Sequence, residues 1–173
     1  MSKKITISLN QKSIDSAIKD LKAYQQTLDA KTNELISELE KIGIETIKSI
    51  VSEIPYEDKG NDISVGSDGT EGSDGVYKTR IRLSGSKVLF IEFSAGITYG
   101  QSDYPLPSGS GFGVGTYPGQ KNAFNPDGWY YTDQETGQTG IHSYGNRAYM
   151  PVYHASEAIV LQVHDIAKRI FGG

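Results

Sequence analysis

The segment Lys87–Gly96, KVLFIEFSAG, governs how the middle of the chain folds, because it is strongly apolar and ends in a glycine. Such a run predicts a buried strand. The preceding segment, VYKTRIRLS, also has the composition of a strand, and Gly85–Ser86 separates the two. Since a glycine at the first central position suits a type II′ turn, the two segments predict a hairpin in which Leu83 pairs with Val88.

Side chains alternate along this predicted strand, so Leu89, Ile91 and Phe93 share one face. That face needs cover from a helix or from a second subunit, although a β-bulge would shift the register. Glu92 lies inside the same run. A catalytic acid there would need a second carboxylate or a histidine within hydrogen-bonding range. We favour a structural carboxylate bound to a backbone amide or to a basic side chain.

The N-terminal part of the chain predicts one strand and a long helical stretch. Alternating apolar residues predict the strand within 1–10, and residues 11–54 have apolar residues at helical spacing up to Pro55. Ser13 is the expected N-cap. The apolar stripe weakens over 29–32, which predicts two helices or one kinked helix. We interpret the stripe as core packing against a sheet, with contact to a neighbouring subunit as the alternative.

The rest of the chain predicts a sheet over 60–94 and then a long excursion over 95–145. The excursion contains most of the tyrosines and more than half of the glycines, which supply stiff contact area and conformational freedom. Within it, WYY at 129–131 predicts a hairpin whose second strand includes Ile141. A C-terminal helix over 151–171 follows, with a proline in its first turn.

Composition indicates one globular domain over residues 1–173. The absence of cysteine excludes disulfides and thiolate chemistry. The net charge of −4 argues against a general nucleic-acid binder, which would have a basic surface. The chain also lacks an apolar run long enough to span a bilayer, and its first residues lack the apolar core of a signal peptide.

The sequence contains no motif for a catalytic, cofactor or metal site. It has no glycine-rich phosphate loop ending in GKS or GKT, no GxSxG nucleophile turn and no HExxH helix. We therefore expect no enzyme activity, no cofactor, no bound metal and no membrane partner.

Two other classes of protein remain as alternatives. A carbohydrate-binding module would stack sugars on Trp129, Tyr130 and Tyr131. A hydrolase would need two carboxylates across a cleft. The pairs that the sequence offers are Glu92 with Asp103 and Asp127 with Asp133.

Three segments, FIEFSAG (90–96), WYY (129–131) and GIHSYGNRAYMPVYHA (140–155), follow the N-terminal strand and helices in order. This order resembles the tail-component family of long-tailed bacteriophages, which includes tail-completion and head–tail joining proteins. The resemblance covers nearly the whole chain. It implies an α+β fold: an N-terminal strand and a long helix pair, a twisted antiparallel sheet with a long Gly/Tyr-rich loop, and a C-terminal helix packed on the sheet.

The resemblance further implies a structural virion protein, made in the host bacterial cytoplasm and built into the neck of the virion. There it would form a homo-oligomeric, six-fold ring between the head connector (portal, adaptor or stopper) and the tail-terminator or tail-tube proteins. DNA would pass through the ring without sequence-specific binding. A minor head component is the alternative. The candidate subunit-interface residues are Leu89, Ile91, Phe93, Phe112, Tyr117, Trp129, Tyr130, Tyr131 and Tyr149.

Overall fold

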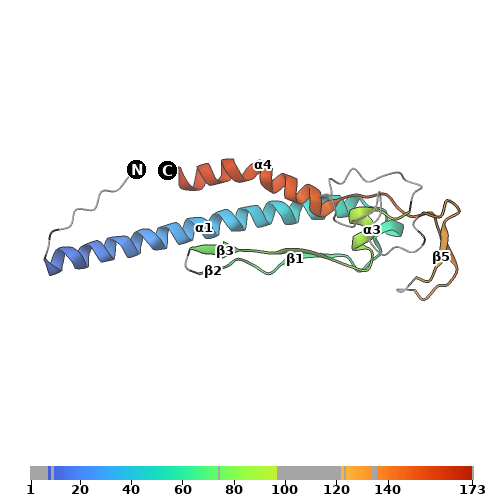
Figure 1. Ribbon diagram of the computed structural model, residues 1–173, viewed down its shortest axis with the longest axis horizontal. Coiled ribbons are helices and arrows are strands. Elements are labelled where there is room, and N and C mark those ends of the chain that lie inside the picture. Colours follow the sequence, from blue (N-terminus) through green and yellow to red (C-terminus); the bar gives the residue numbers. More distant parts are fainter. Residues whose placement is uncertain are drawn as a thin grey trace.

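The computed structural model describes residues 8, 10–73, 75–96, 122, 124–133 and 136–172. These residues form an elongated α+β structure in which a long helix, α1, lies between a second helix, α4, and a long β-hairpin (Figure 1). The α+β class is as predicted. The strand expected within 1–10 lies outside the described residues, apart from Ser8 and Asn10.

Helix α1 (Gln11–Glu53) is one continuous helix of 43 residues, about 65 Å long at 1.5 Å per residue. The predicted break over 29–32 does not occur, because those residues are compatible with a helix and none is proline. Asn10, and not Ser13, is the N-cap: its side chain accepts a hydrogen bond from the Ser13 amide at 2.9 Å. The helix ends before Pro55, as predicted.

Four strands form the long hairpin that runs beside α1. They are β1 (Ser64–Ser67), β2 (Glu71–Ser73), β3 (Val76–Lys78) and β4 (Ile81–Ser84). β1 pairs antiparallel with β4, and β2 pairs antiparallel with β3. The expected single sheet is therefore two short ladders along one hairpin, with a third pair, β5–β6, at the far end of the molecule (Figure 1).

Polar contacts attach this hairpin to α1. The carboxylate of Glu40 accepts hydrogen bonds from the hydroxyls of Ser67, at 2.5 Å, and Thr79, at 2.6 Å. Nearer the hairpin tip, burial raises the pKa of the Tyr77 hydroxyl, and a hydrogen bond with Asp29 raises it further. The hairpin is thus tied to α1 from the middle of the helix to Asp29.

We expect Glu40→Ala to lower the free energy of unfolding by about 1–2 kcal/mol, because two hydrogen bonds to a charged acceptor are lost at a partly exposed site. Urea unfolding followed by circular dichroism measures the change. Glu45→Ala is the matched control, since Glu45 is exposed on the same helix and forms a weak surface ion pair with Lys41 at 3.9 Å. Equal losses in the two variants would mean that Glu40 does not anchor the hairpin.

Residues Val88–Phe93 form a short helix, α3, so the strand predicted there is wrong. The predicted pairing of Leu83 with Val88 is wrong as well, since β4 takes β1 as its partner and Leu83 lies opposite Val65. A short apolar run fits a buried helical turn as well as a buried strand. Here the surrounding segments bury Ile91 completely and leave Leu89 half exposed, as expected of a helix with one inner face.

Helix α4 (Pro151–Phe171) begins with Pro151 in its first turn, as predicted, and has Lys168 and Arg169 in its last turn. It packs mainly along α1, and not on the sheet as expected. Gly43 of α1 permits this approach: a Cβ there would lie 3.0 Å from Cδ1 of Ile159 and 2.4 Å from Cδ1 of Ile81. The Arg169 guanidinium pairs with the Glu38 carboxylate, which raises the pKa of Arg169.

Candidate interaction site

The end of α3 and the segment that leads into α4 form one buried joint. Ala95 and Asn146 exchange backbone hydrogen bonds of 3.0 and 2.9 Å, and Asn146 Nδ2 donates to the Phe90 carbonyl at 3.0 Å. The Ile91 carbonyl accepts from the amides of Tyr149 and Met150. Two segments that are far apart in sequence are therefore locked together before α4 begins.

Glu92 caps α4 from within this joint. Its side chain is 4% exposed, and its two carboxylate oxygens accept from the Val152 and Tyr153 amides at 2.9 and 3.0 Å. These amides belong to the first turn of α4, where the helix dipole favours a negative charge. The prediction of a structural carboxylate bound to a backbone amide is confirmed. Asp103, its proposed catalytic partner, lies outside the described residues.

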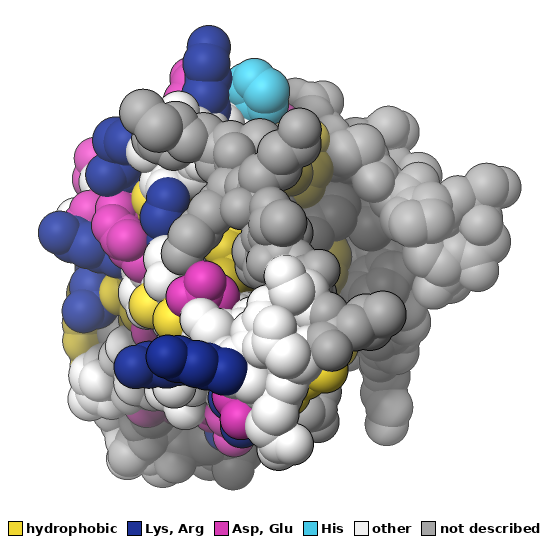
Figure 2. Space-filling view, turned by 90° about the vertical axis from the view of Figure 1, so that its left-hand side faces the viewer, with side chains coloured by type: hydrophobic (Ala, Val, Ile, Leu, Met, Phe, Trp, Pro, Cys, Tyr) yellow, Lys and Arg dark blue, Asp and Glu magenta, His cyan; other side chains and the backbone are white. Residues whose placement is uncertain are grey.

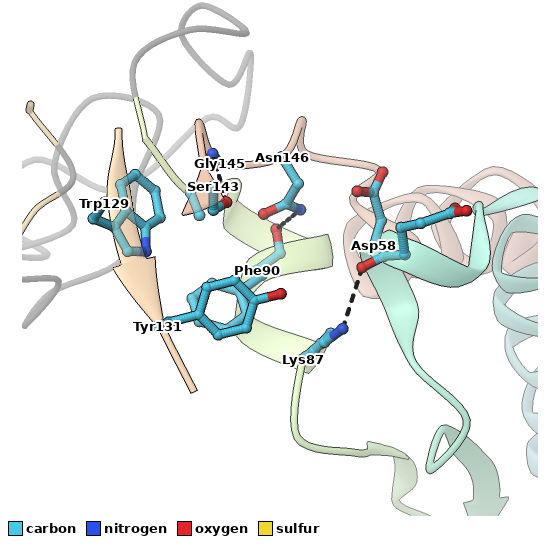
Figure 3. Close-up of a pocket in the computed structure, with 10 residues that line it drawn as sticks. Asp58, Lys87, Phe90, Trp129, Tyr131, Ser143, Gly145 and Asn146 are labelled. Carbon is cyan, nitrogen blue, oxygen red and sulfur yellow. Dashed lines mark hydrogen bonds between the residues drawn. The ribbon is translucent and has the colours of Figure 1, made fainter. Parts of the chain in front are cut away.

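A cavity of about 180 Å³ lies between the joint and the β5–β6 hairpin (Figure 3). β5 (Trp129–Tyr131) pairs with β6 (Ile141–Ser143) as predicted, and the short helix α2 (Tyr56–Lys59) forms the opposite wall. This volume is below that of pockets for drug-sized ligands, which begin at about 300 Å³. The cavity therefore suits one inserted side chain or a few waters better than an oligosaccharide.

Polar groups that line this cavity form hydrogen bonds within the subunit. Lys87 Nζ donates to the Glu57 carbonyl at 3.2 Å, and the Tyr149 hydroxyl donates to Asp58 Oδ2 at 2.5 Å. The guanidinium of Arg147 lies 5.1 Å from the centre of the Tyr149 ring. Tyr149, a candidate interface residue, thus braces the joint against α2.

The three consecutive aromatic residues of β5 do not form one flat surface. Trp129 and Tyr131 point toward α3 and line the cavity, as Figure 3 shows. Tyr130 points to the opposite face, where it is 73% exposed and its ring centre lies 4.7 Å from that of His142. Strand alternation separates the side chains, so the carbohydrate-binding hypothesis loses its three-ring platform.

The other candidate interface residues are spread over different surroundings. Leu89 is half exposed, Phe93 is half-buried, and Ile91 is buried in the subunit core because α3 is helical. Phe112 and Tyr117 lie outside the described residues. The candidates that the structure describes are therefore not brought together into one patch.

A different apolar surface emerges on the first half of α1. We call it the α1 stripe: Ile14, Ile18, Leu21, Tyr24 and Leu28, whose exposed fractions run from 42% to 63%. Interpreting these residues as core packing missed this surface. The sequence did contain a signal, namely the length of the apolar stripe. In the structure the stripe continues along α1 past the residues that contact the hairpin and α4.

Charges of both signs surround this end of the molecule. Figure 2 views the structure from the end where α1 begins, and basic and acidic side chains are interspersed there with exposed hydrophobic ones. Lys12, Asp15, Lys19 and Lys22 are exposed around the stripe. A mixed rim around an apolar centre is the usual composition of a protein–protein interface.

Among the described residues, no group of three or more His, Asp or Glu side chains is placed to hold a metal ion. Within the same part of the chain, no helix combines the length and the hydrophobicity needed to cross a membrane. Comparison of the chain with protein-family models, curated proteins and solved structures found no match.

Proposed function

We propose that this chain is a structural assembly subunit that associates with copies of itself and serves in the neck of a long-tailed phage. The α1 stripe is the observation that carries the self-association. Five large apolar side chains with exposed fractions of 42–63% lie on one side of a single helix. Contiguous exposed apolar surface of this kind marks protein–protein contact sites.

A second exposed apolar pair lies elsewhere on the molecule. Val160 and Leu161, on the outer side of α4, are 70% and 78% exposed. Closed rings need two different contact patches on each subunit. The α1 stripe and the outer side of α4 are two such patches on separate helices, so copies that pair through the stripe can be joined further through α4 into an assembly larger than a pair.

The neck assignment is supported by the resemblance of residues 90–96 and 140–155 to phage tail-component proteins. These two segments contain the partners of the buried joint, including Glu92 and Asn146. Residues that build such a joint preserve the fold of a subunit, and the position in the virion is inferred from the resemblance. The partners proposed on this basis are head-connector and tail-terminator or tail-tube proteins.

The test is co-sedimentation of the purified chain with heads and with tails of the phage that encodes it. We expect stable binding to at least one of the two particles, and the particle that binds identifies the side of the neck. Binding to neither, with the chain folded by circular dichroism, would overturn the neck assignment. A glycan array would then test the carbohydrate-binding alternative.

Leu21→Lys should weaken incorporation into such particles by about ten-fold or more, because it places a charge in the centre of an apolar contact. Tyr56→Lys is the matched control: Tyr56 is 58% exposed on α2, beyond the opposite end of α1. Particle-bound protein is quantified by gel densitometry after sedimentation. Equal binding of the two variants would remove the α1 stripe from the assembly interface.

A further inference from the structure

The α1 stripe has the spacing of one side of a coiled coil. Ile14, Leu21 and Leu28 recur every seven residues, with Ile18 at the intervening position between the first two. This is the alternation of three and four residues that places apolar side chains in the seam between two helices. The next intervening position is Gln25, so the seam is short and contains a polar residue.

Among the described residues, the helix and the strands that pack on α1 stop before they reach the stripe. α4 ends close to Glu38, which pairs with Arg169 in its last turn, and the hairpin reaches only to Asp29, which binds Tyr77. From there to the start of α1, no other labelled helix or strand of the described residues lies beside it (Figure 1). About 27 Å of helix, over residues 11–28 at 1.5 Å per residue, carries the exposed side chains of the stripe, although Ala17 beside them is only 5% exposed.

We propose that the free chain forms a two-fold dimer in which the α1 stripes of two copies pack antiparallel. This inference rests on the self-association in the proposed function and is independent of the phage neck. Antiparallel packing places the two bodies at opposite ends of the paired segment, where they do not collide. Because the helix is already formed and anchored, pairing does not require it to fold first.

Charge complementarity selects the register. With the two-fold axis between positions 19 and 20, Ile18 of one copy lies beside Leu21 of the second copy. In the same register, the positions that flank the seam place Asp15 of each copy next to Lys22 of the other. Asp15 and Lys22 are both exposed on the single chain, so two equivalent ion pairs form across the dimer. A parallel pair places Ala17 opposite Lys22 and offers no such match.

The experiment is sedimentation equilibrium on the wild-type chain, Asp15→Lys, Lys22→Asp and the double variant. We expect a dimer for the wild type, and a dissociation constant raised about ten-fold or more by either single reversal, because like charges then face each other twice. The double variant restores the opposite charges and should return the dissociation constant to within about two-fold of the wild-type value. Circular dichroism confirms that every variant is folded.

Orientation is tested by cross-linking, which the absence of native cysteines makes unambiguous. A mixture of Asp15→Cys and Lys22→Cys chains with a short bismaleimide should give the mixed cross-linked dimer in preference to either homodimer. A monomeric wild-type chain at about 100 μM overturns the proposal, as does a double variant as weak as the single ones. A monomer that still binds heads or tails would leave the neck assignment standing, whereas a dimer that ignores both particles would leave only this inference.

Discussion

Replacing Gly145 by alanine is expected to lower the free energy of unfolding by about 3 kcal/mol or more. Gly145 has φ +95°, a conformation that favours glycine, and a Cβ there would lie 1.8 Å from the Ala95 carbonyl oxygen. That oxygen accepts the hydrogen bond from the Asn146 amide. The new methyl group must therefore push apart the two segments of the buried joint, and backbone atoms have no rotamer that relieves the clash.

Gly140→Ala separates the two causes of this loss. Gly140 has φ +73°, and a Cβ added there would meet no atom within 4 Å, so only the backbone conformation is penalised. We expect a loss of about 1–2 kcal/mol. Urea unfolding of the two variants gives the comparison. Equal losses would mean that the close approach of Gly145 to Ala95 adds nothing to the stability of the joint.

Helices with a long periodic pattern and a hairpin with strong local signals were predictable from the sequence. Pro151 suits the first turn of α4 because proline has no amide hydrogen, and amides in the first turn lack a partner within the helix. The WYY segment pairs with Ile141–Ser143, which follows it after nine residues. Both outcomes depend on interactions between residues close in the chain. The α+β class follows from the same local signals.

Segment 88–93 was mispredicted because its conformation depends on distant residues. VLFIEF has no alternation that separates a strand from a helical turn. Its conformation depends on hydrogen bonds with distant residues: the Ile91 carbonyl binds the segment before α4, and Glu92 binds the first turn of α4. The α1 stripe was misassigned for a related reason. Its spacing predicts a buried face, but the sequence does not say whether the cover comes from the same chain.

Glu92→Gln is expected to lower the free energy of unfolding by about 2–4 kcal/mol, the second large effect in this protein. The substitution keeps the shape of the side chain but removes the charge that faces the first turn of α4. Its NH₂ group also presents a donor where the Val152 and Tyr153 amides require an acceptor on each oxygen. One amide is left unpaired at a site where Glu92 is only 4% exposed.

The amides that lose protection from exchange identify the cause of the loss in stability. Glu157→Gln is the matched control, since Glu157 is an exposed carboxylate further along the same helix and accepts from the Tyr153 hydroxyl at 3.0 Å. It should change stability by no more than about 0.5 kcal/mol. Hydrogen exchange should show faster exchange of the Val152 and Tyr153 amides in Glu92→Gln alone. A Glu92→Gln chain as stable as Glu157→Gln, with those amides still protected, would mean that the carboxylate charge is not what holds α4 to the joint.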